Sequence, residues 1–123
     1  MVIFLDTYAI IEIDRDNPNY RNYAFQQIDA VTTIFNLAEI YFYYLKNFGQ
    51  NEADDIYNII KPMAINVGDS IIKEAGKFKL LHLKKRLSFA DCVGYATALK
   101  FNAKFLTGDY AFKDFDNVEF VKK

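Results

Sequence analysis

Short runs of apolar residues alternate with longer amphipathic stretches along the chain, and each run ends at a polar residue. Val2 to Leu5 is apolar at every position, which is typical of a strand buried on both faces of a parallel sheet. Further strands are predicted over 30–33, 62–67, 103–107 and 117–121. The alternation of strands with helices predicts an α/β fold, a three-layer domain with a mainly parallel sheet.

Helices are predicted between these strands from apolar positions three or four residues apart. A short helix over 8–13 is followed, after the break at Asn17-Pro18-Asn19, by a second helical segment over 20–28. Later helices are expected over 34–47, 52–60, 68–85 and from Ser88 onwards. The stretch 34–47 is apolar almost all round, so it must be buried or cover an interface.

The composition suits one domain, residues 1–123, because 52% of the residues are hydrophobic and 25% are charged. The apolar runs are too short to span a bilayer and the N-terminus lacks a signal peptide, so we expect a cytoplasmic protein with no membrane partner. The single cysteine, Cys92, excludes an internal disulfide and is expected to be a small buried residue. The single histidine, His82, is expected at a partly exposed helical position, which weakens any mechanism that needs a histidine base.

The net charge is only −1, but the charges are unevenly distributed. Residues 1–69 contain 10 acids and 4 bases, whereas residues 70–123 contain 6 acids and 11 bases. A basic strip precedes Ser88 and consists of Lys73, Lys77, Lys79, Lys84, Lys85 and Arg86. A solvated helix face explains this strip as readily as a surface that holds a phosphate backbone.

Four carboxylates occupy comparable places in the predicted elements. Asp6 ends the first strand and Asp109 follows the strand 103–107. Asp91 lies in the first turn of the helix that Ser88 caps. Glu39 lies on the apolar helix 34–47, with no basic residue nearby in sequence. Because the carboxyl ends of parallel strands share one edge of the sheet, these acids are expected to converge there.

Each acid also has a simpler interpretation. Asp91 could only complete a capping box with Ser88, and Asp109 could only cap the turn that follows it. For Glu39 a functional role is favoured, since carboxylates are rarely buried without a partner. Four carboxylates close together repel one another unless a cation lies among them. Oxygen ligands suit Mg²⁺ or Mn²⁺, which polarise phosphoryl groups and activate water.

The acids lie in four segments that follow one another at a characteristic spacing. These are Val2-Ile3-Phe4-Leu5-Asp6-Thr7, Leu37-Ala38-Glu39, Leu87-Ser88-Phe89-Ala90-Asp91-Cys92 and Phe105-Leu106-Thr107-Gly108-Asp109. Together they resemble the signature of PIN-domain nucleases over essentially the whole chain. The likeness is nearest to the VapC-type toxins of bacterial and archaeal toxin–antitoxin pairs.

The resemblance implies a metal-dependent endoribonuclease. Its metal ligands for one or two Mg²⁺ (or Mn²⁺) ions would be Asp6, Glu39, Asp91 and Asp109. Thr7 and Thr107 match the family's small hydroxyl residues, which orient a carboxylate or a metal-bound water. A metal-activated water would then hydrolyse the RNA phosphodiester and leave a 5′-phosphate and a 3′-hydroxyl. The fourth acid stays open between Asp109 and Asp114.

The resemblance also implies a homodimer that is silenced by a cognate antitoxin, whose tail occupies the groove near the acids. The helices 34–47 and 52–60 are expected to carry the antitoxin or dimer contacts. Their tyrosines, which cannot all point into one small core, are Tyr41, Tyr43, Tyr44 and Tyr57.

Other classes fit the sequence less well. A response-regulator receiver domain needs an acidic pair just after the first strand, and a haloacid-dehalogenase-like phosphatase needs a second aspartate two residues after the first. Thr7 and Tyr8 follow Asp6 instead. The remaining alternative is a non-catalytic PIN-like module that binds RNA or a protein, because a fold alone does not establish an activity.

Overall fold

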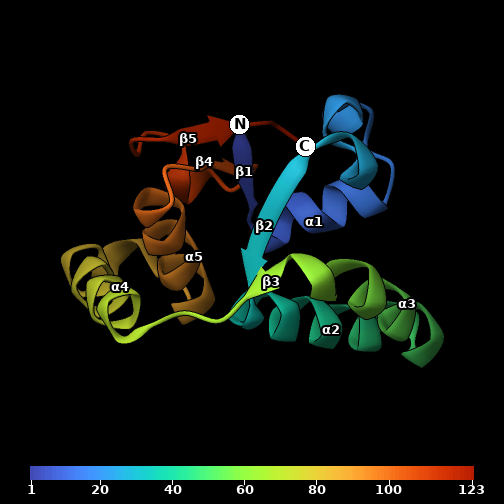
Figure 1. Ribbon diagram of the computed structural model, residues 1–123, viewed down its shortest axis with the longest axis horizontal. Coiled ribbons are helices and arrows are strands. Elements are labelled where there is room, and N and C mark those ends of the chain that lie inside the picture. Colours follow the sequence, from blue (N-terminus) through green and yellow to red (C-terminus); the bar gives the residue numbers. More distant parts are fainter.

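Five parallel strands form one sheet in the computed structural model, which describes all residues 1–123 (Figure 1). The strand order is β3-β2-β1-β4-β5. The strands are β1 (Val2–Leu5), β2 (Asp29–Thr33), β3 (Ala64–Ile65), β4 (Lys104–Thr107) and β5 (Val118–Phe120). Leu5 pairs with Leu106, so the residues after β1 and β4 emerge side by side at one edge. The predicted α/β class with a parallel sheet is confirmed.

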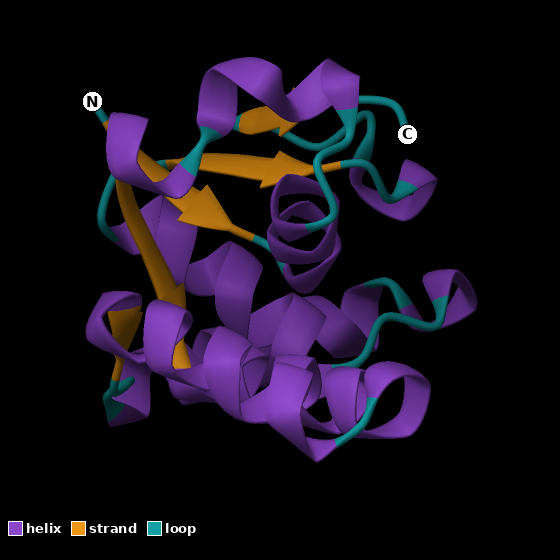
Figure 2. Cartoon of the chain, turned by 90° about the vertical axis from the view of Figure 1, so that its right-hand side faces the viewer, coloured by secondary structure: helices purple, strands orange, loops and turns teal.

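Helices cover both faces of the sheet. They are α1 (Thr7–Asp14), α2 (Ile34–Phe48), α3 (Gln50–Ile60), α4 (Asp69–Leu81) and α5 (Phe89–Lys100). Phe4 and Phe105 point into the core under α4 and α5, whereas the next residues, Leu5 and Leu106, point into the core under α1, α2 and α3. This alternation follows from the period of two along a strand. Figure 1 shows the sheet between the two sets of helices, and Figure 2 views the chain from the side of α1 and α3.

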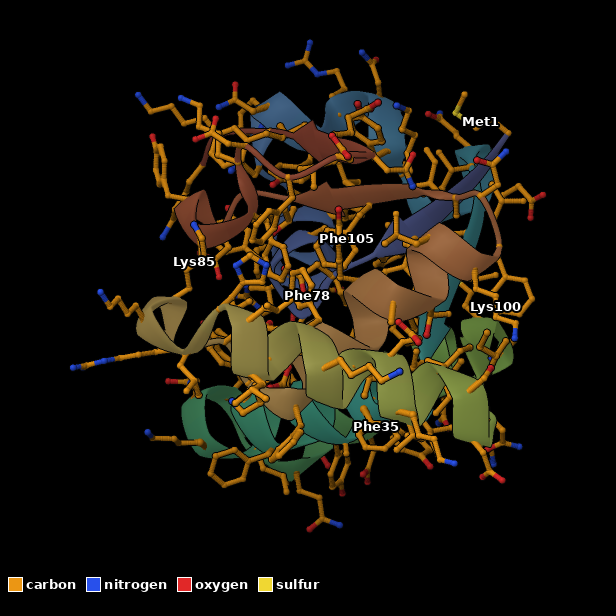
Figure 3. All side chains as sticks on the ribbon, turned by 90° about the vertical axis from the view of Figure 1, so that its left-hand side faces the viewer. Met1, Phe35, Phe78, Lys85, Lys100 and Phe105 are labelled. Atoms are coloured by element: carbon orange, nitrogen blue, oxygen red, sulfur yellow. The ribbon has the colours of Figure 1, made fainter.

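An aromatic cluster fills the core under α4 and α5. The ring of Tyr95 lies 5.0 Å from that of Phe78 and 5.5 Å from that of Phe105, measured between centroids, and Figure 3 shows both phenylalanines on this side of the molecule. Cys92 is buried in the same core, as predicted. His82 is the C-cap of α4 and is half-buried against Phe78, so its predicted partial exposure is confirmed.

The helical segment predicted over 20–28 is helical in the structure, but its helices are of the 3₁₀ type. The segment forms two 3₁₀ helices, Pro18–Tyr23 and Phe25–Gln27, separated by Ala24 in an extended conformation. Tyr20 is buried and its hydroxyl donates a 2.6 Å hydrogen bond to the carbonyl of Val121. This contact joins the segment to the C-terminal end of the chain.

Two further boundaries differ from the predicted ones. The strand expected over 62–67 shortens to β3 because Pro62, which has no N–H to donate, lies in the 3₁₀ helix Lys61–Met63. The helix expected over 68–85 ends at Leu81 and continues as the 3₁₀ helix Leu83–Lys85. No helix in the structure combines the length and hydrophobicity that a membrane-spanning segment requires.

The surface of α2 differs from the predicted tyrosine surface. Tyr44 is only 1% exposed, and its hydroxyl hydrogen-bonds to the carboxylate of Asp14. The prediction that Tyr44 contributes to a contact surface is therefore wrong, because this side chain belongs to the core. The most exposed ring of the helix is instead that of Phe42, at 65%.

Candidate active site

Asp6 is the buried centre of the site. It follows β1 directly and is the N-cap of α1, where its Oδ1 accepts a hydrogen bond from the Thr7 N–H at 2.9 Å. The hydroxyl of Thr107, at the end of β4, donates to Oδ2 of Asp6 at 2.6 Å. Both side chains are almost fully shielded from solvent. The pairing of β1 with β4 thus fixes both oxygens of the carboxylate.

The pKa of Asp6 is raised from an ordinary value of 3.8 to about 8, and burial is the largest cause. The charges of Asp91 and, less strongly, Asp109 also raise it, whereas the hydrogen bonds from Thr107 and Thr7 lower it. Asp6 forms no salt bridge with a lysine or arginine. The site therefore holds excess negative charge that a bound cation would compensate.

Asp91 is both a helix cap and a member of the acidic cluster. Its Oδ2 accepts from the Ser88 N–H at 2.8 Å and its own N–H donates to the Ser88 Oγ at 3.0 Å, which completes the predicted capping box. Burial raises the pKa of Asp91, the hydrogen bonds from Ser88 lower it, and the charges of Glu39 and Asp109 raise it. The capping role therefore places this carboxylate beside the other acids.

Glu39 connects α2 to the starts of two other helices. Its Oε1 accepts from the Thr7 hydroxyl at 2.7 Å, and its Oε2 accepts from the Ser88 hydroxyl at 3.3 Å. Asn36, one turn earlier and fully buried, donates to the Thr7 oxygen at 3.1 Å. Glu39 and Asn36 are thus directed at the site from an otherwise apolar helix, and Ser88 gains a second role that a capping signal does not reveal.

Asp109 follows β4 and also acts as a cap. Its N–H donates to the Thr107 hydroxyl oxygen at 3.0 Å, and its Oδ1 accepts from the Ala111 N–H at 2.9 Å. Its charge raises the pKa of both Asp6 and Asp91. Asp114 is exposed. Of the two candidates for the fourth acid, Asp109 is the one that the site brings in.

Gly108 matters for packing, although the sequence suggested only a turn. A Cβ at this position would collide with the ring of Tyr8 and lie 2.7 Å from the carbonyl oxygen of Val121. The only glycine with a positive φ is Gly49, so Gly108 is required for close approach and not for a turn conformation. The sequence carried no signal for this role beyond the glycine between Thr107 and Asp109.

The donor set suits a divalent cation in its chemistry. No group of three or more aspartate, glutamate, histidine or cysteine side chains is arranged as a ready metal cage. One oxygen of Asp91 and one of Asp109 each accept from a backbone N–H. Mg²⁺, however, is usually held by one or two carboxylates together with water and substrate phosphate. The buried, uncompensated carboxylate of Asp6 and its acidic neighbours fit that type of ligation.

Two lysines of the basic strip, Lys79 and Lys85, contact the segments that carry Asp91 and Asp109. The Lys79 ammonium hydrogen-bonds to the Leu87 carbonyl and lies 4.9 Å from the centre of the Phe89 ring. Lys85 donates to the Ala111 carbonyl at 3.1 Å. These two lysines tie down the segment before α5, whereas Arg86 and its neighbour Lys84 are exposed.

Comparison with known proteins defines the class. The PIN domain profile matches residues 3–118, which is nearly the whole chain. The chain therefore belongs to the PIN-domain family. A search of curated proteins finds no match to the sequence.

Several solved structures share this fold at low sequence identity. A toxin–antitoxin complex from Klebsiella pneumoniae contains a chain with a TM-score of 0.71 and 14% identity over 95% of both chains. VapBC2 from Rickettsia felis, bound to a promoter DNA fragment, gives a TM-score of 0.71 and 17% identity over 99% of this chain and 98% of the other. VapC20 of Mycobacterium tuberculosis, a sarcin–ricin loop cleaving toxin, gives a TM-score of 0.69 and 17% identity. The match covers 94% of this chain and 92% of the other.

Proposed function

We propose that this chain is an Mg²⁺- or Mn²⁺-dependent endoribonuclease and the toxin of a toxin–antitoxin pair. The observation that carries the proposal is the buried Asp6, which forms no salt bridge and whose carboxylate is acted on by the charges of two further acids, Asp91 and Asp109. Capping α1 does not by itself require this burial, since burying an unpaired carboxylate is costly. The burial is explained by a cation, and a cation held by carboxylates is suited to phosphodiester chemistry.

The residues of the site take distinct roles in this proposal. The carboxylates that would hold the metal are Asp6, Asp91 and Asp109, with Glu39 at the side of α2. Thr107 keeps the Asp6 carboxylate in one orientation, and Thr7 does the same for Glu39. When bound, the metal would polarise the phosphoryl group and lower the pKa of an attacking water. Fixed carboxylates reduce the reorganisation needed when charge develops on the phosphate.

The toxin assignment is supported by the solved relatives. The Klebsiella pneumoniae structure is a toxin–antitoxin complex, and VapC20 is described as cleaving the sarcin–ricin loop. We infer from them that this chain cuts RNA in the cytoplasm, binds a cognate antitoxin and forms a homodimer. The alternative, a PIN-like module that binds RNA or protein without cutting, would not need the full set of acids around Asp6.

The decisive experiment incubates the purified protein with a mixed RNA pool and Mg²⁺ or Mn²⁺, with EDTA as a control. Asp91→Asn retains the size and the capping ability of the residue, so a folded Asp91→Asn variant without activity separates catalysis from capping. Asp109→Asn should also abolish cleavage, whereas the matched Asp114→Asn should cut normally. An intact RNA pool with every metal, from a protein that is folded by circular dichroism, would favour the binding module.

A further inference from the structure

An open pocket adjoins the acids on the side of α2. It has a volume of about 450 Å³ and is lined by Thr7, Glu39, Phe42, Tyr43, Lys46 and Asn47. The volume falls within the roughly 300–1,000 Å³ of typical small-ligand sites. Because Thr7 and Glu39 belong to the candidate active site, the pocket begins at the acids and leads away from them along the helix.

The lining residues of α2 form one face of the helix, since they follow Glu39 at steps of three and four residues. Phe42 lies about one turn beyond Glu39 and Lys46 about two turns, which is roughly 10 Å along the axis at 1.5 Å per residue. A ligand that leaves the acids along this face meets first an aromatic ring and then a cation.

Both of these groups are free to bind a ligand. The ring of Phe42 is 65% exposed and pairs with no other aromatic ring, unlike its neighbour Tyr43, which packs edge-on against Tyr44. Lys46 takes part in no salt bridge and no cation–π contact of the structure. An exposed ring next to an unpaired cation is the combination with which proteins bind single-stranded nucleic acid.

We propose that this pocket binds the nucleotide next to the scissile phosphate, with its base stacked on Phe42 and its outer phosphate held by Lys46. The inference rests on the proposed ribonuclease function and adds to it the position of one base. A base inside a duplex has both faces covered by its neighbours and cannot also stack on a protein ring, so the pocket selects RNA that is not in the interior of a duplex beside the cut. Specificity for the kind of base is weak, because every base has a π-face.

The lining favours RNA over an apolar protein segment. Only Phe42 and Tyr43 are hydrophobic among the six residues, and the others carry a hydroxyl, a carboxylate, an ammonium or an amide. A protein helix docking by its apolar face needs a continuous hydrophobic groove. Here the ring lies between an acid of the site and a free lysine, which matches the alternation of base and phosphate along a strand.

The test uses a labelled single-stranded RNA that the wild type cuts at one position, together with copies that carry one abasic nucleotide at each neighbouring position. Affinity is measured by fluorescence anisotropy in the Asp91→Asn background, so that the RNA stays intact. We expect one flanking abasic position to weaken binding about 5- to 100-fold, as for the loss of one stacked base. Phe42→Ala should weaken binding of the intact RNA similarly and remove the sensitivity to that abasic position.

Two further variants separate the contributions. Phe42→Tyr keeps the aromatic ring, so it should bind the intact RNA with wild-type affinity and lose affinity at the same abasic position as the wild type. Lys46→Ala should weaken all the RNAs alike and lower the slope of log affinity against log salt by about 1, as expected for one lost phosphate contact. Leu45→Ala is the matched control, since Leu45 is 39% exposed on the same helix but does not line the pocket.

The outcomes distinguish this proposal from the function on which it rests. Suppose that the wild type cuts RNA, and that Phe42→Ala binds the intact RNA with unchanged affinity and still responds to the same abasic position. The proposed stacking site is then overturned, and the exposed ring of Phe42 is assigned to a protein contact instead. A wild type that neither binds nor cuts RNA with any metal overturns both the subsite and the ribonuclease.

Discussion

The Thr107 hydroxyl donates a 2.6 Å hydrogen bond to Oδ2 of Asp6, although the two residues are 101 positions apart. The neighbouring strands β1 and β4 end side by side, so the bond closes the edge of the sheet where the acids gather. Thr107→Val removes the donor and leaves two buried polar groups without a partner, because the Asp109 N–H also donates to this hydroxyl. We expect a loss of about 1–3 kcal/mol in the free energy of unfolding.

Urea unfolding measures this change, and Thr107→Ser, which keeps the hydroxyl, is the control. A Thr107→Val protein that unfolds at the wild-type urea concentration would show that the bond contributes nothing to stability.

Asp6 makes the stability of the metal-free protein depend on pH. Its pKa is about 8 in the folded chain and near the ordinary 3.8 when unfolded, so the native state binds more protons between these values. The free energy of unfolding therefore falls as pH rises from about 4 to 8. Asp6→Asn stays neutral and still caps α1. Its free energy of unfolding, relative to that of the wild type, should therefore increase over this pH range by a few kcal/mol, on the order of 1.36 kcal/mol per pKa unit.

Melting curves at pH 5 and pH 8 in EDTA test this expectation. The exposed Asp114→Asn should follow the wild type at both pH values. Parallel behaviour of Asp6→Asn and the wild type would mean that Asp6 is charged, and hence compensated, in the native protein.

Mg²⁺ or Mn²⁺ should stabilise the wild type at pH 8, because a cation relieves the repulsion among the carboxylates. A ligand that binds only the native state contributes about 2.7 kcal/mol when its free concentration is about a hundred times Kd. Thermal melting at increasing metal concentration measures the shift, which should shrink strongly in Asp6→Asn and Asp91→Asn. Equal shifts in all three proteins would place the metal elsewhere.

Gly108→Ala should destabilise the fold, because the added methyl group meets the Val121 carbonyl and the Tyr8 ring. Overpacking of this kind typically costs about 1–3 kcal/mol. Gly76→Ala is the matched control on α4, where a Cβ has no neighbour within 4 Å, and it should stabilise the helix by up to about 1 kcal/mol. Chemical denaturation measures the free energy of unfolding of both variants, which should decrease for Gly108→Ala and increase for Gly76→Ala.

Tyr44→Ala should destabilise the protein by about 3–5 kcal/mol, as for other large side chains removed from a core. Tyr44 is almost fully buried and bonded to Asp14, so this substitution would not isolate a surface contact. Tyr43→Ala, at a position 37% exposed, should unfold within about 1 kcal/mol of the wild type. Tyr43 is therefore the better position at which to test antitoxin or dimer contacts on α2.

Several elements could be predicted from the residues alone. The apolar run Val2–Leu5 gave a buried strand, and Ser88 with Asp91 gave a capping box. Both are local patterns, because a strand face and a helix cap depend on residues within a few positions of one another. The contact of Tyr20 with Val121 could not be predicted in the same way, since it joins residues 101 positions apart.

Most strands and helices, and the acids at their ends, follow from the amino-acid sequence alone, since hydrophobic periodicity and capping are short-range. The folded chain was needed to show that β1 lies beside β4, that Thr7 bonds to Glu39 and that Phe42 remains exposed. Strand order and side-chain exposure depend on pairings between segments far apart in the chain, which no local pattern specifies. The convergence of the acids around Asp6 is therefore a property of the folded sheet.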